Sequence, residues 1–300
     1  MKKSLLGVLA VSLLLAGLVG CGSSSPTKSA SPSTSSPASG PTAHRIVSLS
    51  STATEMLFAL GADHRVVAVD SQSDYPARAP KTKLSAYEPN VEAIAKYHPD
   101  LVVFATDTKG LKAGLQKLEI RVLQLPAAVT VDDTYHQIAE LGDVTGRPKA
   151  AAALVTRIKS GLAKAVARLE PRTKPLTYYY ELDNTLYTVT SKTFVGSLFT
   201  MAKLDNVADP ADADGKSGGY PQLSAEFLVK ANPDLVFLAD SKCCGQDEKT
   251  FGARPGFDTM KAVTDHQVIT LDDDIASRWG PRIVDLLDRI VDAANAAPAA

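Results

Sequence analysis

The sequence predicts an α/β protein made of two similar lobes with mostly parallel sheets, joined by one long helix. Along the chain, short apolar runs rich in β-branched residues alternate with helical patterns, which is typical of a parallel sheet covered by helices. One segment pattern, which predicts a short helix, a turn and a strand, occurs twice: as VEAIAKYHPDLVVF at residues 91–104 and as AEFLVKANPDLVFL at residues 225–238. We call this pattern the repeated corner. One helical pattern, residues 148–169, lies between the two copies. At 1.5 Å per residue this helix would be about 33 Å long, which is enough to connect two lobes.

Composition and charge limit the classes of protein to consider. The chain has 300 residues, 45% of them hydrophobic, so a folded globular protein with two domains is expected. The formal net charge is −1, and lysine and arginine do not cluster along the chain. Nucleic acid is therefore not an expected partner, because phosphate binding needs a concentrated basic surface.

The first twenty residues have the order of an export signal peptide. Lys2 and Lys3 precede an apolar stretch, which ends in small residues before Cys21. The end of this stretch, LVGC, resembles the bacterial lipobox, which would make Cys21 the lipidated first residue of the mature protein. The alternative is an ordinary secretory signal with a chance cysteine.

Residues 21–43 are expected to form a disordered linker after the lipidated cysteine. The segment that follows Cys21 is rich in Ser, Pro and Thr and contains no aromatic residue, so it cannot bury a core. We expect an exported protein of the cell envelope, lipid-anchored to the outer face of the cytoplasmic membrane or held in the periplasm.

The first lobe is expected at residues 44–147, the connecting helix at 148–170 and the second lobe at 171–300. Pro148 suits the first position of the connecting helix. Strands are predicted at residues 45–50, 65–70, 100–105 and 121–125 in the first lobe, and at 176–182, 186–190, 234–240 and 268–272 in the second. Helices are predicted at 52–61, 132–146, 194–204 and 281–295, the first of them closed by Gly61.

Each copy of the repeated corner places a glutamate in the first turn of its helix. Asn90 and Ser224 are strong N-caps, which puts Glu92 and Glu226 at the second helical position. Two readings stay open at this point. Each carboxylate stabilises its own helix through the dipole, or the two form a matched pair for a partner with two-fold symmetry. His98 takes the place of Asn232, so we interpret it as a helix-end residue and not as a metal ligand.

Signals for catalysis or for a resident metal are missing from the sequence. The other four histidines are scattered and form no set with metal-ligand spacing: His44, His64, His136 and His266. There is no G-x-S-x-G elbow, no phosphate-binding loop and no G-x-G-x-x-G after a strand. We therefore expect no enzyme activity, no catalytic residue, no bound cofactor and no protein-held metal.

If Cys21 carries lipid, Cys243 and Cys244 are the remaining cysteines, and they are neighbours. A disulfide between them would be strained, because adjacent Cα atoms are closer than disulfides prefer. Export favours oxidation. A vicinal disulfide, a soft-metal clip and two reduced thiols all stay open.

Loops at the ends of strands carry the candidate ligand-binding residues. Ligands of open α/β sheets bind outside the carboxyl ends of the strands, and aromatic faces suit a large, partly apolar molecule. The candidates are Ser51, Thr52, Asp74, Tyr75, Tyr87, Asn184, Tyr220, Arg278 and Trp279.

Five stretches together resemble the periplasmic binding proteins of cobalamin and ferric-siderophore ABC importers, the class III type. They are RIVSLSSTATEMLFALGADHRVVAVDSQSDYP, NVEAIAKYHPDLVV, the long helix, GGYPQLSAEFLVKANPDLV and ASRWGPRIVDLL. The similarity covers residues 45–295. It implies two Rossmann-like lobes joined by a rigid helix, with a cobalt- or iron-containing chelate bound between them as ligand.

The resemblance also implies partners and roles for particular residues. Glu92 and Glu226 would dock on arginines of a permease dimer that works with ATPase subunits, which favours the matched-pair reading. Tyr87 and the Tyr220–Pro221 pair stand where cobalamin binders place aromatic residues. The ending DDDIASRWGPR is similar to cobalamin and haem binders, whereas Arg278, Tyr75 and Tyr87 would also serve a siderophore. A monomer is expected.

Three other functions are compatible with the sequence. The first is a receptor for a metal ion or haem. The second is an extracellular enzyme built on the same two lobes, which would need a base and a nucleophile within hydrogen-bond reach. The third is a signalling lipoprotein that binds a chelate but has no permease.

Overall fold

A computed structural model describes residues 41–298 of the chain. The chain divides into two units, residues 1–36 and 37–300, and all described residues belong to the second unit. The expected signal peptide, Cys21 and nearly all of the expected linker lie outside the described residues. Within the described part, no helix is long and apolar enough to cross a membrane.

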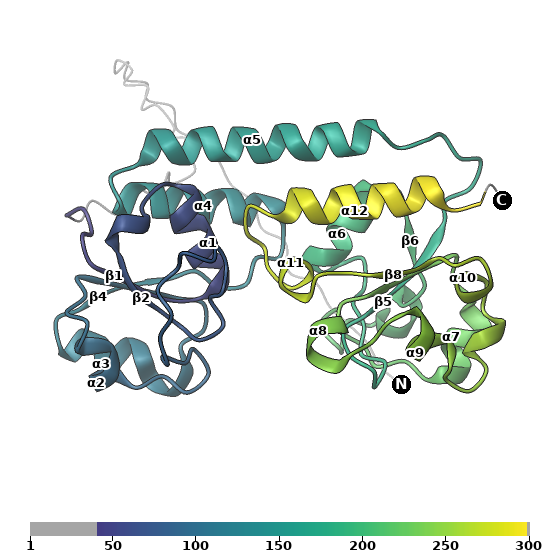
Figure 1. Cartoon of the computed structure of the whole chain (residues 1–300), viewed down its shortest axis with the longest axis horizontal. Coiled ribbons are helices and arrows are strands. Elements are labelled where there is room, and N and C mark those ends of the chain that lie inside the picture. The colour runs from purple at the N-terminus through teal and green to yellow at the C-terminus, as the bar shows by residue number, and fades with distance from the viewer. Residues whose placement is uncertain (1–40, 299–300) are drawn as a thin grey trace, which may run out of the picture. The chain divides into compact units, whose positions relative to one another are not determined.

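Two four-stranded sheets form the framework, and all pairings within them are parallel (Figure 1). The first sheet has the order β2-β1-β3-β4, with β1 Ile46–Leu49, β2 Val66–Val69, β3 Leu101–Phe104 and β4 Arg121–Gln124. The second has the order β6-β5-β7-β8, with β5 Thr177–Glu181, β6 Asp205–Asn206, β7 Leu235–Leu238 and β8 Val268–Thr270. The predicted fold class, α/β with two lobes joined by a long helix, is confirmed.

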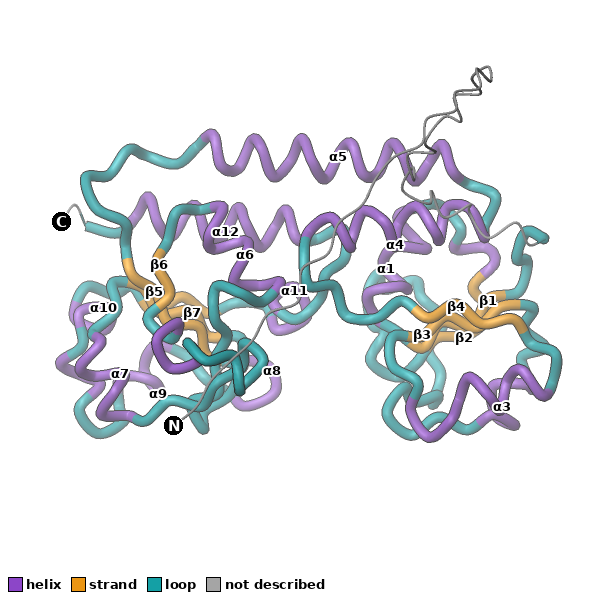
Figure 2. Tube along the Cα trace, turned by 180° about the vertical axis from the view of Figure 1, so that it is seen from behind, coloured by secondary structure: helices purple, strands orange, loops and turns teal. Residues whose placement is uncertain are grey.

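Helices cover both faces of the first sheet. Helices α1 Ser51–Ala59 and α4 Val131–Val144 lie on one face, and α2 Val91–Ala95 and α3 Leu111–Lys117 lie on the other (Figure 2). Successive side chains of a strand point to opposite faces of the sheet, so each strand contributes apolar residues to the helix layers on both faces. In β3, Leu101 and Val103 join the core with α1 and α4, whereas Val102 and Phe104 pack with α2 and α3.

Helix α5, Pro148–Ala167, follows α4 along the chain and leads to the second sheet. It packs against α4 near its beginning and against α12 Ile283–Ala296 near its end (Figure 1). Its buried stripe has helical spacing and includes Leu154, Ile158 and Leu162. Gly161 lets α12 approach closely, because an added Cβ would lie 2.7 Å from the side chain of Val284.

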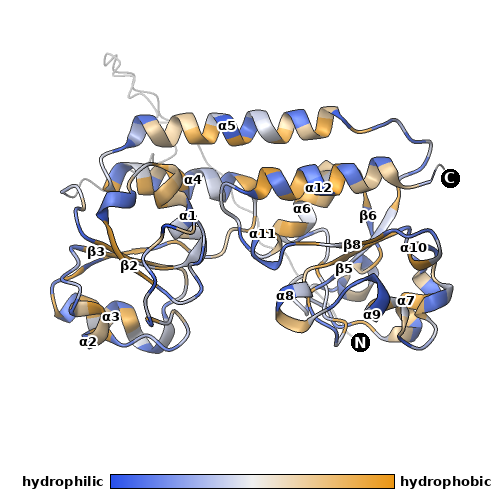
Figure 3. Cartoon of the chain, viewed as in Figure 1, coloured by the Kyte–Doolittle hydropathy of each residue, from blue (hydrophilic) through white to orange (hydrophobic). Residues whose placement is uncertain are grey.

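The second sheet repeats the plan of the first. Helices α6 Phe194–Met201 and α12 lie on one face, and α7 Ala225–Ala231, α9 Glu248–Gly252 and α10 Lys261–Thr264 lie on the other. Apolar and charged residues alternate along α12 with helical period, so one side faces the core (Figure 3). Two single-turn helices follow β7 and β8: α8 Ser241–Cys244 and α11 Asp273–Ala276. Short 3₁₀ turns lie at Asp63–Arg65, Thr108–Gly110, Asp209–Asp212 and Phe257–Thr259.

The prediction of a strand at residues 186–190 is wrong. This segment makes only isolated bridges, between Thr188 and Glu181 and between Tyr187 and Gln222. Strand β5 already has β6 and β7 as its two neighbours, so the sheet offers no free edge beside it. In addition, Leu186 has a φ of 69°, which turns the chain out of the extended conformation.

Candidate functional site

The repeated corner folds in the same way in both lobes. Asn90 and Ser224 cap α2 and α7, and each side chain accepts a hydrogen bond from a backbone N–H three residues on, at 2.7 and 3.1 Å. The predicted N-caps are therefore confirmed. Helix α7 is longer than α2, but the chain turns after both in the same way, because the equivalent residues His98 and Asn232 both have a φ of 47°.

The repeated aspartates anchor the first strand of each sheet. Asp100 accepts from the backbone N–H of His44 at 2.7 Å, just before β1. Asp234 accepts from the N–H of Thr177 at 2.8 Å, where β5 begins. The Pro-Asp-Leu-Val part of the repeat thus has a structural role in both lobes. Glu92 and Glu226 are exposed in the first turns of α2 and α7, and these two helices lie on the side of their sheets that faces away from α5 (Figure 1).

A cavity of about 520 Å³ lies at the carboxyl ends of β1, β2 and β3, where the segment after α11 reaches the first lobe. This is the edge at which parallel sheets present their loops to ligands. The lining residues are Leu49, Ser50, Ser51, Thr52, Asp70, Gln72, Ala86, Tyr87, Ala105, Thr106, Thr108, Asp274, Ser277, Arg278 and Trp279.

The cavity brings together five of the nine predicted ligand-binding residues: Ser51, Thr52, Tyr87, Arg278 and Trp279. The lining does not include the other four, which are Asp74, Tyr75, Asn184 and Tyr220. Of these, Asn184 and Tyr220 are exposed on loops of the second lobe. Their part in ligand binding stays a prediction.

Hydroxyl groups dominate the first-lobe wall of the cavity. Ser50 caps α1 and accepts from the N–H of Ala53 at 3.3 Å. Beneath it, a buried chain of hydroxyls leads to the carboxyl group of Asp70 through Ser73. Burial raises the pKa of Asp70, although the hydrogen bond from Ser73 and the charge of Arg278 oppose that rise. The wall therefore offers hydroxyl groups for hydrogen bonds, with the carboxyl group of Asp70 behind them.

Arg278 lies in the cavity wall, but both terminal nitrogens of its guanidinium group donate hydrogen bonds within the protein. It donates to the Glu55 carboxylate at 2.9 Å and to the Gln72 carbonyl oxygen at 3.0 Å. It also donates to Asp74 at 3.1 Å and to Asp274 at 2.6 Å. The side chain is only 9% exposed. Arg278 thus connects the second lobe to the first, in addition to lining the cavity.

Glu55 is the functional residue that the sequence reasoning missed. Its carboxylate is buried on α1 and also accepts from Arg282, at 2.8 and 2.6 Å. The sequence contains one indication of this role, because Glu55 is the one charged residue of the apolar helix TATEMLFALG. A carboxylate that is buried with such a helix almost always has a cationic partner. The guanidinium group of Arg282 also stacks on Tyr75, 4.1 Å from the ring centre, and neither residue lines the cavity.

The predicted residue Asp74 forms part of the same contact between the lobes. It pairs with Arg278 and with Lys242 of α8, whose Nζ lies 3.1 Å from its carboxylate. Burial alone would raise the pKa of Asp74, but the hydrogen bonds from Lys242 and Arg278 hold that pKa below its ordinary value. Asp74 therefore stays charged and attracted to the second lobe.

The two aromatic residues of the cavity differ in how firmly they are held. Trp279 donates from Nε1 to Gln137 at 2.9 Å, and its carbonyl oxygen accepts from Thr134 on α4. Tyr87 is 74% exposed. A fixed indole and an exposed phenol thus line the same cavity.

The corresponding edge of the second sheet carries a buried pair of acids. Glu181, at the end of β5, accepts two hydrogen bonds from Arg254, at 2.7 and 2.6 Å. Asp240 follows β7 and is buried, and neither of its side-chain oxygens has a partner among the described residues. Burial and the neighbouring charge of Glu181 raise the pKa of Asp240 to about 7, against the opposing charge of Arg254.

Within α8, Cys243 and Cys244 form a vicinal disulfide in the structure. Within residues 41–298, no group of three or more His, Cys, Asp or Glu side chains is arranged to hold a metal ion.

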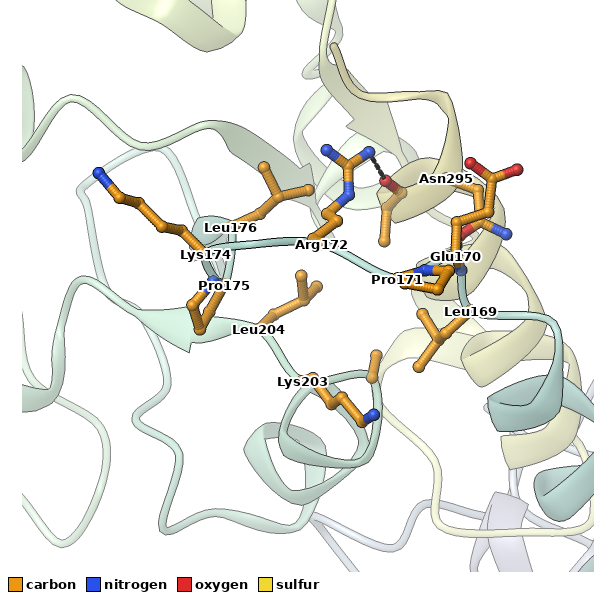
Figure 4. Close-up of a pocket in the computed structure, with 12 residues that line it drawn as sticks. Leu169, Glu170, Pro171, Arg172, Lys174, Pro175, Leu176, Lys203, Leu204 and Asn295 are labelled. Atoms are coloured by element: carbon orange, nitrogen blue, oxygen red, sulfur yellow. Dashed lines mark hydrogen bonds between the residues drawn. The ribbon is translucent and has the colours of Figure 1, made fainter. Parts of the chain in front are cut away.

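A separate cavity of about 330 Å³ lies where α5 leads into β5 (Figure 4). It contains none of the predicted site residues. Arg172 crosses it and donates to the carbonyl oxygens of Ala294 and Ala297, both at 2.6 Å, at the end of α12. Lys174 and Lys203 extend away from each other and do not converge on a common point (Figure 4). The residues of this cavity therefore fasten α12 to the α5–β5 connection.

Comparison with known proteins agrees with this geometry. A family model described as periplasmic binding protein matches residues 46–275. The ABC transporter substrate-binding lipoprotein YvrC of Bacillus subtilis (strain 168), itself uncharacterised, is 29% identical over 259 residues, which cover 83% of this chain and 79% of that protein. A cobalamin-binding protein of Halobacterium salinarum is 34% identical over 200 residues, which cover 64% of this chain and 53% of that protein.

The fold is shared with solved structures as well. A protein from Staphylococcus epidermidis ATCC 12228, described as a possible iron-binding, periplasmic solute-binding protein, superposes with a TM-score of 0.71 at 29% sequence identity. The match covers 84% of this chain and 98% of that one.

Proposed function

Because the chain belongs to the periplasmic binding protein family, we propose that it captures a metal chelate of the corrinoid type and delivers it to an ABC permease. The family consists of binding proteins and not of enzymes. The observation that carries the proposal is the cavity at the carboxyl ends of β1, β2 and β3, closed by Arg278 and Trp279 of the second lobe.

The charges around the cavity favour a ligand without strong negative charge. Arg278 is the one cationic side chain among the lining residues given above, and four protein acceptors already occupy it. The lining also contains the acids Asp70 and Asp274. A carboxylate- or catecholate-rich ferric siderophore would find no free counter-charge there, and burying an unpaired charge is costly.

The polar groups of the cavity suit a corrinoid. A corrinoid is a broad ring edged by amide groups, and serine, threonine and glutamine side chains can both donate to and accept from amides. Tyr87 and Trp279 supply aromatic faces for the ring. The cobalamin-binding relative from Halobacterium salinarum supports the same choice.

A ferric chelate is the second candidate ligand. It is favoured by the likeness to the Staphylococcus epidermidis protein, which is described as possibly iron-binding. For such a ligand, Arg278 would have to exchange Asp74 or Asp274 for an anionic group of the chelate.

Delivery would use the doubled corner and a lipid anchor. The exposed Glu92 and Glu226 lie in equivalent turns of the two lobes, which matches a permease dimer with its ATPase subunits. Anchoring through Cys21 is supported by the LVGC sequence and by the name of the lipoprotein relative. One monomer would then serve one permease dimer at the outer face of the membrane.

Isothermal titration calorimetry of the purified chain tests the ligand. Cyanocobalamin, haemin and a panel of ferric siderophores are titrated separately. We expect saturable one-to-one binding of cyanocobalamin. Binding of a ferric siderophore alone would replace the corrinoid with the second candidate, and the absence of binding by all of them would reject a chelate as the ligand.

A further inference from the structure

Helix α8 carries a chemical group that the proposed function does not use. The Cys243–Cys244 disulfide lies within this single turn, and both cysteines are exposed. Because the two residues are adjacent, the disulfide closes a small ring that includes the peptide bond between them and restricts the rotation of that part of the backbone. Exposure makes the disulfide accessible to thiols in solution.

The same turn is tied to α11 through its backbone. The Asp273 carboxylate accepts from the N–H of Cys243 at 2.9 Å and from the N–H of Lys242 at 3.0 Å. It also accepts from the hydroxyl group of Ser241 at 2.9 Å. A single turn of helix is not stable by itself, so the conformation of α8 depends on these bonds and on the ring. The next residue of α11, Asp274, lines the ligand cavity.

The side chain of Lys242 extends this connection to the other lobe. Its Nζ contacts Asp74 of the first lobe at 3.1 Å and Asp274 at 2.5 Å. The other ion pairs between the lobes, within residues 41–298, come from Arg278 and Arg282, after α11. Lys242 therefore provides a second point of attachment, and it is the immediate neighbour of the disulfide.

We propose that Cys243–Cys244 is a redox site that controls the contact between the lobes through Lys242 and Asp74. In the oxidised form the ring holds the turn that presents Lys242 to Asp74. Two thiol molecules reduce the site: the disulfide bond breaks, each cysteine sulfur gains a proton, and the two thiols join in a new disulfide. The freed turn then holds Lys242 less firmly. Thiol–disulfide exchange with an oxidised partner reverses the step.

Hydrogen exchange of the full chain, followed by mass spectrometry with and without a phosphine reductant, tests this coupling without any ligand. Exposed ion pairs contribute little, so we expect exchange in the segment 71–75 of the first lobe to become about two- to fivefold faster on reduction. Exchange in the segment 241–246 should rise at the same time. Differential alkylation with peptide mapping reports the state of Cys243 and Cys244 separately from Cys21.

Three variants separate the possible causes. Cys243→Ser with Cys244→Ser should behave as reduced wild type and should not respond to reductant. Lys242→Met should show fast exchange at 71–75 in both states. Lys216→Met is the matched control, because Lys216 pairs only locally with Asp214, and it should respond as wild type does.

Three results would overturn the proposal. One is the finding of free thiols at Cys243 and Cys244 in protein purified under oxidising conditions. Another is reduction that loosens α8 and leaves 71–75 unchanged. The last is a response of 71–75 to reductant that persists in Lys242→Met.

Discussion

Arg278 and Glu55 are 223 residues apart in the chain, and their side chains form a 2.9 Å ion pair across the boundary between the lobes. Arg282, at the N-cap of α12, binds the same carboxylate at 2.6 Å. The segment that closes the cavity is thus fastened to the first lobe by charges that are almost completely buried. The contact explains why Arg278 is held by the protein instead of being free for a ligand.

Replacement of Glu55 should cost a large part of the stability. Glu55→Gln removes the charge that Arg278 and Arg282 share, so we expect the free energy of unfolding to fall by about 3 kcal/mol. Urea unfolding followed by circular dichroism measures the change. Glu88→Gln is the control, because Glu88 pairs with Lys109 at an exposed position, where a loss below about 1 kcal/mol is expected. Equal stability of the two variants would contradict the role given to Glu55.

Stability should depend on pH through Asp240. Its pKa is raised from an ordinary value of 3.8 to about 7, so the folded protein binds this proton more tightly than the unfolded chain does. The resulting stabilisation is complete below pH 4 and is lost as the pH rises through 7. By linkage, about 2–3 kcal/mol of it should disappear between pH 5 and pH 8.

Asp240→Asn isolates this contribution, because the amide has no proton to lose. The variant should gain stability relative to wild type between pH 5 and pH 8, as measured by urea unfolding at both values. Asp258→Asn changes an exposed aspartate of the same lobe and serves as the control. Its free energy of unfolding should differ from that of wild type by the same amount at pH 5 and at pH 8. A constant difference for Asp240→Asn as well would show that Asp240 is ionised in both states.

Tyr87 should contribute to ligand affinity without contributing to folding. The side chain lines the cavity and is 74% exposed, so Tyr87→Ala should leave the unfolding midpoint unchanged. Loss of an aromatic contact with a corrinoid ring should weaken cyanocobalamin binding about tenfold in calorimetry. Tyr187→Ala, at another exposed tyrosine outside the cavity lining, is the matched control. Unchanged affinity of Tyr87→Ala would remove Tyr87 from the site.

Glu92 and Glu226 should matter for delivery and not for capture. In cells that carry the cognate permease, the double change to alanine should reduce uptake of labelled cobalamin at least about tenfold, because both ends of the docking surface lose their charge. Calorimetry should show unchanged affinity. Glu170→Ala, at an exposed site after α5, should transport normally. Normal uptake by the double variant would leave these glutamates with only their effect on the helix dipole.

Much of the fold could be predicted because it depends on local patterns. The caps of α2 and α7, the stripe of α5 and the end of α1 at Gly61 all follow from residues a few positions apart. The segment 186–190 has the composition of a strand but forms none, because β6 and β7 already occupy both sides of β5, and the order of strands in a sheet does not follow from local patterns.

The candidate site, too, could be predicted only in part. That Ser51, Thr52, Tyr87, Arg278 and Trp279 line one cavity could be predicted, since the carboxyl ends of parallel strands collect at one edge. The pairing of Arg278 with Glu55 could not be foreseen, because it joins residues that are distant in the chain. The same is true of Lys242 and Asp74.

By itself, the sequence determined the two α/β lobes, the long helix between them and the repeated corner, because helix periodicity, strand composition and caps act over a few residues. Only the tertiary structure decided that Arg278 pairs with Glu55, Asp74 and Asp274 and that, in the described part of the chain, the cavity lining contains no other lysine or arginine. The physical reason is that the strength of an ion pair depends on distance and burial, and both are properties of the folded chain.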